Sequence, residues 1–169
     1  MTNKLFGNDV RAGTISDMNN TNQRVALITG GNRGLGLQTA RELGRQGIRV
    51  ILGARDASQA AAAARALHTE NIEADPLRLD VTDSRAHEEA YEILEARFGR
   101  LDILVNNAGI WRESATSSDY VRGSNRTSSI SMEVLREIFE TNFFGTVALT
   151  NRLLPLIRKS AAGRIVNAS

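Results

Sequence analysis

The stretch TGGNRGLG at residues 29–36 decides how this chain folds. It follows a short aliphatic run at residues 25–28 and leads into a pattern of helical period, so its glycines lie where a strand turns into a helix. Glycine has no Cβ, so its backbone can adopt positive φ and approach a pyrophosphate closely. The N–H groups of the first helical turn supply hydrogen-bond donors and a partial positive charge. The stretch therefore predicts a phosphate-binding turn.

The spacing of the glycines does not by itself identify the ligand. It is Gly30-x-x-x-Gly34-x-Gly36, which departs from the dinucleotide fingerprint G-x-G-x-x-G. No Lys-Ser or Lys-Thr pair follows, so the stretch is not a P-loop either. A glycine-rich turn without any ligand stays open as an alternative at this point.

Composition narrows the classes of function. The chain has 169 residues, 41% of them hydrophobic, which is enough for one sizeable core. It has no cysteine, which excludes a disulfide framework, a thiolate nucleophile and a cysteine-based metal site. The two histidines, His68 and His87, stand apart on predicted helices, where we expect solvated surface side chains and no metal site.

Charge and hydropathy indicate where the protein acts. The 21 basic and 19 acidic residues are mixed along the chain, which argues against a nucleic-acid partner, although the sequence pI of about 9.5 leaves that class open. No apolar stretch reaches membrane-spanning length, and the chain does not begin with a hydrophobic signal segment. We therefore expect a cytoplasmic protein without a membrane partner.

From Arg24 onward, compact apolar runs alternate with amphipathic stretches. Because the apolar runs are continuous, both faces of the predicted sheet should be covered, as in a Rossmann-type doubly wound parallel sheet with strand order 3-2-1-4-5. The pattern predicts strands at residues 25–29, 49–52, 76–79, 103–106 and 164–169, and helices at 35–45, 57–70, 85–98 and 132–159, the last one interrupted near Gly145 and Pro155.

Two segments fall outside this alternation. Residues 1–23 are rich in Asn, Thr, Asp and Gly and predict a flexible leader. Residues 111–131 are rich in Ser, Arg, Thr and Asn and predict a long loop. Such loops are either functional lids or mobile insertions, and this composition favours mobility.

The sequence resembles the short-chain dehydrogenase/reductase family from Arg24 to Ser169. Five motifs in the family's order carry the resemblance: TGGNRGLG at 29–36, Leu79-Asp80-Val81, NNAG at 106–109, Thr141-Asn142 and GRIVNAS at 163–169. The stretch ETNFFGT and the long insert after NNAG resemble the carbonyl-reductase-type members. The resemblance implies an oxidoreductase that uses a nicotinamide dinucleotide to interconvert a carbonyl and an alcohol.

The resemblance also implies roles for the matched positions. The loop would hold the pyrophosphate, Asp80 would accept a hydrogen bond from the adenine amino group beside Val81, and the NNAG turn would lie against the ribose. A helix cap is the alternative for Asp80, and an ordinary strand-ending turn is the alternative for NNAG. The expected cofactor-binding residues are Gly30, Asn32, Arg33, Gly34, Leu35, Gly36, Arg55, Asp80, Val81, Asn107, Ala108 and Gly109.

Residues near the end of the second strand favour NADP(H) over NAD(H). In NAD-binding domains an acidic residue about 20 positions beyond the glycines binds the ribose 2′-hydroxyl, and it would repel a 2′-phosphate. Ala54 stands where the family would have that acid. Arg33 and Arg55 can both face the 2′-phosphate, to which guanidinium groups make charge-assisted hydrogen bonds. Two solvated arginines are the alternative.

Only one of the catalytic residues that the resemblance implies is matched, and it is Asn142. In the family a helix asparagine holds a water that links the catalytic lysine to solvent. A helix bend near Gly145 would free a main-chain carbonyl for that water. A polar helix residue facing solvent is the alternative for Asn142.

The family's general acid, the tyrosine of a Tyr-x-x-x-Lys motif, is absent. Tyr91 and Tyr120 are followed at that spacing by Glu95 and Ser124. Ser169 aligns one position short of the family's catalytic serine, or onto it if the alignment shifts by one residue.

We therefore expect residues 24–169 to be an incomplete NADP-binding Rossmann domain, truncated after its fifth strand, from a longer reductase. The chain alone would bind NADP(H) without turnover, and the complete protein would act on a small-molecule carbonyl or alcohol. A non-catalytic NADP(H)-binding module or sensor is the alternative. Family members often pair through the helix that contains Asn142, so a homo-oligomer is a possible assembly.

Overall fold

The computed structural model describes residues 23–111 and 130–168. The predicted leader, apart from its last residue, lies outside the described part of the chain. Most of the predicted loop at 111–131, together with Tyr120, also lies outside it, and so does Ser169.

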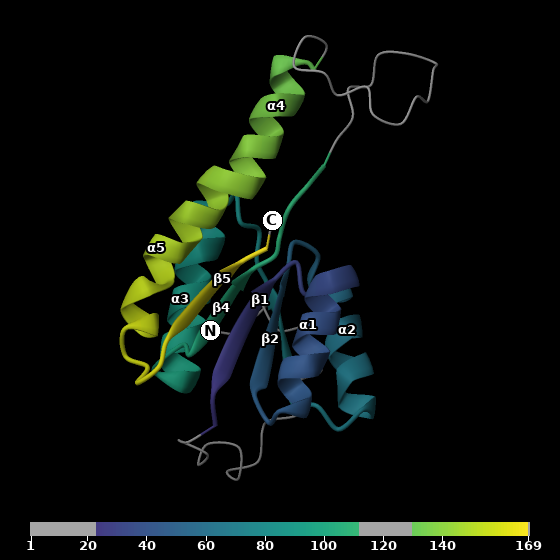
Figure 1. The fold of residues 1–169 in the computed structure, drawn as a ribbon, viewed down its shortest axis with the longest axis vertical. Coiled ribbons are helices and arrows are strands. Elements are labelled where there is room, and N and C mark those ends of the chain that lie inside the picture. Colours follow the sequence, from purple (N-terminus) through teal and green to yellow (C-terminus); the bar gives the residue numbers. More distant parts are fainter. Residues whose placement is uncertain (1–22, 112–129, 169) are drawn as a thin grey trace.

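A sheet of five parallel strands forms the centre of the fold (Figure 1). The strand order is β3-β2-β1-β4-β5, as predicted. Each strand joins the next through a right-handed helical connection of the kind that parallel pairing requires. The strands are β1 (Val25–Thr29), β2 (Arg49–Ala54), β3 (Ala74–Arg78), β4 (Ile103–Asn106) and β5 (Arg164–Asn167).

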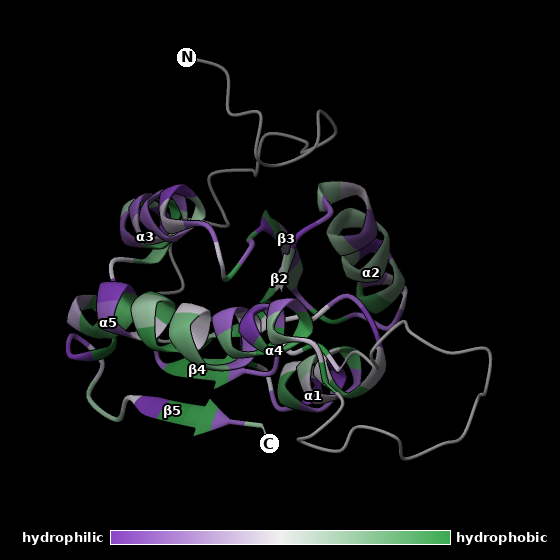
Figure 2. Ribbon diagram, turned by 90° about the horizontal axis from the view of Figure 1, so that it is seen from above, coloured by the Kyte–Doolittle hydropathy of each residue, from purple (hydrophilic) through white to green (hydrophobic). Residues whose placement is uncertain are grey.

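Helices cover both faces of the sheet, α1 and α2 on one and α3 and α5 on the other (Figure 2). Capping residues set where two of them begin: Asp56 accepts hydrogen bonds at the start of α2, and Asp83 does so at the start of α3. The helices are α1 (Gly34–Arg45), α2 (Ala57–Thr69), α3 (Ser84–Phe98), α4 (Met132–Phe139) and α5 (Thr146–Ile157), with a π-helical segment η2 (Glu140–Gly145) between the last two.

The alternation of side chains along β1 divides the core into two layers. Val25 and Leu27 pack with residues of α3 and α5, whereas Ala26 and Ile28 pack with residues of α1 and α2. All five residues of β1 are buried. The prediction that both faces of the sheet are covered is therefore confirmed at β1, but it is wrong at β5, whose four residues are all exposed.

β5 forms an exposed edge of the sheet. It pairs in parallel with β4, from Ile103 opposite Arg164 to Asn106 opposite Asn167. All four of its residues are exposed, including Ile165 at 41% and Val166 at 49%.

The predicted interruption of the long helix is confirmed at one of its two positions. Helices α4 and α5 run as one rod through η2, whose wider turns contain Asn142 (Figure 1). The interruption predicted at Pro155 is wrong, because α5 continues through it to Ile157. Pro155 has no N–H to donate to the carbonyl of Asn151 four residues earlier, so α5 continues through it with one hydrogen bond fewer.

The prediction for His87 is also wrong. Its side chain is only 5% exposed, and its Nε2 lies 2.8 Å from the carbonyl oxygen of Val81. His68 is exposed as expected, although its Nε2 contacts the carbonyl oxygen of Ala74 at 2.7 Å. Across residues 23–111 and 130–168, no helix combines the length and the apolar character needed to cross a membrane.

Candidate cofactor-binding site

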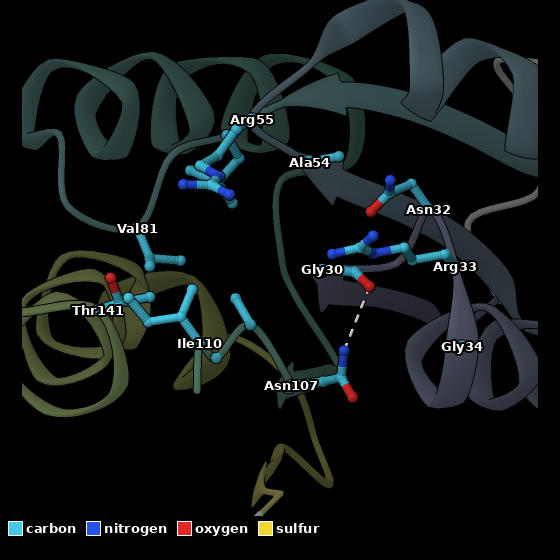
Figure 3. Close-up of a pocket in the computed structure, with 13 residues that line it drawn as sticks. Gly30, Asn32, Arg33, Gly34, Ala54, Arg55, Val81, Asn107, Ile110 and Thr141 are labelled. Atoms are coloured by element: carbon cyan, nitrogen blue, oxygen red, sulfur yellow. Dashed lines mark hydrogen bonds between the residues drawn. The ribbon is translucent and has the colours of Figure 1, made fainter. Parts of the chain in front are cut away.

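A cavity of about 250 Å³ lies beyond the carboxyl ends of β1, β2, β3 and β4 (Figure 3). Ligands of open parallel sheets bind at this edge, where the strand order reverses. The residues that line the cavity are Gly30, Asn32, Arg33, Gly34, Ala54, Arg55, Leu79, Val81, Asn107, Ala108, Gly109, Ile110 and Thr141.

The glycine loop forms one wall and requires glycine for two different reasons. Gly30 and Gly34 have φ of +63° and +55°, in the left-handed region that L side chains rarely adopt. Gly36 has ordinary φ, but a Cβ there would collide with the side chain of Asn107 and the carbonyl of Gly30. These glycines therefore allow the chain to turn sharply after β1 and to begin α1 in close contact with Asn107.

The N-terminus of α1 lies at the cavity, and no side chain among the described residues caps its first N–H groups. Arg33 occupies the N-cap position in extended conformation, and its side chain makes no capping hydrogen bond. The first turn contains no acidic residue. The first N–H groups of a helix have no intrahelical acceptor, so this end of α1 is suited to an anion.

Thr29 joins the glycine loop to the turn after β4. Its Oγ1 accepts hydrogen bonds from the N–H groups of Asn107 at 3.0 Å and Ala108 at 2.9 Å, and donates to the carbonyl oxygen of Val105 at 3.3 Å. Sequence reasoning missed this role of Thr29. A hydroxyl at the end of a wholly apolar strand was the available signal, but its partners are far away in the sequence.

Asn107 makes a second connection between the same two segments. Its Nδ2 donates to the carbonyl oxygens of Thr29 at 3.0 Å and Gly30 at 3.2 Å, the latter drawn in Figure 3. The side chain of Asn107 thus fixes the glycine loop, in addition to lining the cavity.

Arg33 and Arg55 enter the cavity from two different elements (Figure 3). Both side chains are exposed, and neither makes a hydrogen bond or ion pair with any residue in the described part of the chain. Ala54 lies beside them, and none of the lining residues is acidic. Within residues 23–111 and 130–168, this corner of the cavity therefore carries two positive charges that no acidic side chain neutralises.

Asp56, which follows Arg55 directly in the sequence, uses its carboxylate to cap α2. It accepts hydrogen bonds from the N–H and the hydroxyl of Ser58 at 2.8 and 2.7 Å. The side-chain and main-chain donors of Ser58 hold the pKa of Asp56 below its ordinary value. Gln59 in the same turn accepts a hydrogen bond from Asn32 at 2.7 Å, which connects α2 to the glycine loop.

Asp80 does not line the cavity. Its Oδ1 accepts hydrogen bonds from the N–H and hydroxyl of Thr82 at 2.9 and 2.8 Å, which shapes the turn after β3. The alternative that Asp80 caps α3 is wrong, because Asp83 does so through the N–H of Arg85. The role of Asp80 toward adenine stays a prediction.

Asn142 holds the segment that follows NNAG. Its Oδ1 accepts from the N–H of Ile110 at 2.8 Å, and its Nδ2 donates to the carbonyl of Ile110 at 2.9 Å. Both polar atoms of the side chain are therefore engaged, and Asn142 itself does not line the cavity. Its neighbour Thr141 does line the cavity, as does Ile110; the sequence indicates Thr141 only as part of a family motif and predicts neither residue as part of the site.

The structure thus brings most of the expected cofactor-binding residues around one cavity. Those that line it are Gly30, Asn32, Arg33, Gly34, Arg55, Val81, Asn107, Ala108 and Gly109, and those that do not are Leu35, Gly36 and Asp80. The expected catalytic residue, Asn142, does not line it either. Asp80 lies between the lining residues Leu79 and Val81 in the turn after β3. Gly36 lies in the first turn of α1, two residues after the lining residue Gly34. The individual roles of all these residues toward a ligand stay predictions.

A parallel sheet of this order, with a glycine-rich turn behind its first strand and a cavity at the carboxyl edge, defines a dinucleotide-binding domain of Rossmann type. The model of the short chain dehydrogenase family matches residues 24–169. The chain belongs to this family.

Relatives within the family are similar over most of this chain. Short-chain dehydrogenase/reductase 1 of Saponaria officinalis is 36% identical over 162 residues, covering 87% of this chain and 53% of that protein. Carbonyl reductase [NADPH] 1 of Homo sapiens is 38% identical over 146 residues, covering 86% of this chain and 48% of that protein. The chain thus spans about half the length of the curated relatives it matches.

Solved structures agree with the sequence relatives. A crystal structure of actinorhodin polyketide ketoreductase with NADPH matches with a TM-score of 0.75 and 31% identity, covering 87% of this chain and 53% of the other. A metagenomic short-chain oxidoreductase in complex with NADP matches with a TM-score of 0.72 and 29% identity, covering 85% and 61%.

Proposed function

We propose that this chain binds NADP(H) in the cavity at the carboxyl edge of the sheet. The observation that carries the proposal is the pair of guanidinium groups of Arg33 and Arg55 beside Ala54, in a cavity whose lining residues include no acid. A 2′-phosphate is the part of NADP(H) that NAD(H) lacks, and it needs positive charge where an acid would repel it. The NADPH and NADP named with the relatives support the same choice.

We assign the remaining parts of the cofactor by chemistry. The N–H groups at the start of α1 and the loop around Gly34 would hold the pyrophosphate. Val81 would pack on the adenine, whose amino group would donate to Asp80, and the turn of Asn107, Ala108 and Gly109 would lie against a ribose. NADP(H), when bound, supplies or accepts a hydride.

We further propose that the complete protein is an oxidoreductase that interconverts a carbonyl and an alcohol. This rests on the family and on relatives named as reductases and dehydrogenases. The 169-residue chain lacks the Tyr-x-x-x-Lys general acid, so it would hold cofactor without proton transfer. The alternative, a non-catalytic NADP(H)-binding module, predicts no turnover in any longer form of the protein.

A second copy of this chain is the assembly partner we propose. Four exposed apolar side chains lie along the rod of α4, η2 and α5: Phe139, Phe143, Phe144 and Val147, between 44% and 55% exposed. Helix faces of this kind bury apolar surface when two copies pair. Phe144→Glu should then convert a dimer to monomers in sedimentation velocity, and an unchanged sedimentation coefficient would contradict this pairing.

Thermal melting with each cofactor tests the choice of NADP(H). NADPH should raise the melting temperature of the 169-residue chain more than NADH does, because only a bound ligand stabilises the folded state. Arg55→Asp should reverse this order. Arg24→Asp is the matched control, since Arg24 is also exposed but precedes β1 at the opposite edge of the sheet. Equal shifts with both cofactors would contradict the proposal.

A further inference from the structure

His87, in the first turn of α3, contacts Val81, one of the residues that line the cavity. Its side chain is 5% exposed, and its Nε2 lies 2.8 Å from the carbonyl oxygen of Val81. A carbonyl oxygen can only accept, so Nε2 carries the proton and donates. His87 and Val81 are both buried. A buried carbonyl without a hydrogen-bond donor would lower the stability of the folded state.

The side chain and the main-chain carbonyl of Val81 contact different parts of the structure. Its side chain lines the cavity beside Thr141 and Ile110 (Figure 3). Its carbonyl points away from the cavity, toward His87 and toward Gly145 of η2, where a Cβ would collide with this oxygen. The close approach of Gly145 leaves no room for the carbonyl to move toward η2.

We propose that His87 is a positioning residue of the cofactor site, which keeps the Val81 wall in place by donating to the Val81 carbonyl. The inference rests on the proposed function, NADP(H) binding in this cavity. Without the donor, the buried carbonyl has to find another partner, and the turn after β3 shifts to reach one. The ligand would then have to bring Val81 back to its place in the cavity wall, and the free energy spent on this rearrangement would weaken binding.

The chain contains a matched control for this contact. His68, in the last turn of α2, makes the same kind of contact, with Nε2 2.7 Å from the carbonyl oxygen of Ala74. Ala74 begins β3 and so lies at the amino edge of the sheet, opposite the cavity. A histidine that only stabilises the fold should behave alike at both positions.

The first experiment measures the affinity of the 169-residue chain for 2′,5′-ADP, which contains the adenine and the 2′-phosphate. His87→Leu should weaken binding about three- to tenfold, the loss expected from one hydrogen bond, and His87→Gln, which keeps a donor at similar reach, should restore it. His68→Leu should leave the affinity unchanged even if it lowers the melting temperature. Wild-type affinity in His87→Leu, or equal losses in His87→Leu and His68→Leu, would overturn the inference.

A second readout uses only the wild-type chain and does not require any variant to fold. His68 and His87 are its only histidines, so nitrogen-15 labelling of histidine gives two sets of ring signals. Titration with 2′,5′-ADP should shift the signals of His87 and leave those of His68 in place. Signals of His87 that stay unchanged at saturation would overturn the inference. A wild-type chain that does not bind 2′,5′-ADP would instead refute the proposed function itself.

Discussion

The side chain of Asn107 binds the carbonyl of Gly30, at 3.2 Å from Nδ2 to oxygen, and so joins the turn after β4 to the glycine loop after β1. Both segments line the cavity, and Nδ2 also donates to the carbonyl oxygen of Thr29. The amide of Asn107, together with the hydroxyl of Thr29, therefore holds these two parts of the cavity wall together.

Asn107→Ala should weaken NADPH binding by about tenfold, because the glycine loop loses two hydrogen bonds that preorganise it. Asn107→Asp should weaken it further, since a carboxylate cannot donate to two carbonyls and would repel the phosphates. Isothermal titration calorimetry provides the affinities. Gln38→Ala is the control, because Gln38 is an exposed amide on α1 whose partners are Glu42 and Arg41. Binding by Asn107→Ala as tight as by the wild type would refute this role.

Gly36→Ala should abolish NADPH binding, because its Cβ would collide with the Asn107 side chain and the Gly30 carbonyl. Gly47→Ala is the matched comparison: Gly47 has φ of +76°, but no atom within 4 Å of an added Cβ, and it lies beyond the far end of α1. It should cost about 1 kcal/mol of folding free energy from left-handed strain alone and leave binding intact. Fluorescence titration with NADPH distinguishes the two. Equal effects of the two substitutions would show that sterics at the loop are unimportant.

Acid should destabilise the chain partly through Asp75. Burial raises the pKa of Asp75, but hydrogen bonds and charges from Arg49 at 2.7 Å and Arg97 at 3.0 Å outweigh it and lower the pKa below 3.8. A depressed folded-state pKa means that this stabilisation is complete above the unfolded-state value and is lost as pH falls through the folded-state value. Urea unfolding between neutral and acid pH should therefore show a shallower acid loss in Asp75→Asn.

The same substitution should lower stability at neutral pH by about 1–3 kcal/mol, since Arg49 and Arg97 each lose their ion pair with the largely buried carboxylate of Asp75. Glu73→Gln is the control, because Glu73 also contacts Arg49 but is 57% exposed at its side chain. If Asp75→Asn followed the wild-type pH dependence, the acid loss would have to come from other carboxylates.

The exposed edge of the sheet should make the 169-residue chain prone to self-association. Val166→Lys should reduce light scattering of concentrated samples without lowering the melting temperature, since Val166 is 49% exposed and a charged edge resists pairing. Leu104→Lys is the contrasting variant: Leu104 is fully buried and pairs with Ile165 in the neighbouring strand. It should unfold the protein. Unchanged scattering in Val166→Lys would indicate that β5 is not the associating surface.

The strand order and the place of the cavity were predictable because apolar runs and glycines are local signals. The start of β3 was not, because Ala74 and Asp75 precede its apolar run and belong to the strand through their pairing with Val50 and Ile51 of β2. His87 was misjudged for a similar reason, since the face that a helical histidine presents depends on how α3 packs. The contact of Asn142 with Ile110 also depends on tertiary placement, because neither residue signals the other along the chain.

The central claim, that Arg33 and Arg55 bind a 2′-phosphate, is tested most directly by calorimetric titration of the 169-residue chain with 2′,5′-ADP and with 5′-AMP. These ligands differ only in that phosphate. We expect 2′,5′-ADP to bind at least about tenfold more tightly, as charge-assisted hydrogen bonds would give, and the double variant Arg33→Ser, Arg55→Ser to lose this preference. Equal affinities for the two ligands in the wild type, or a preference that survives in the double variant, would contradict the account.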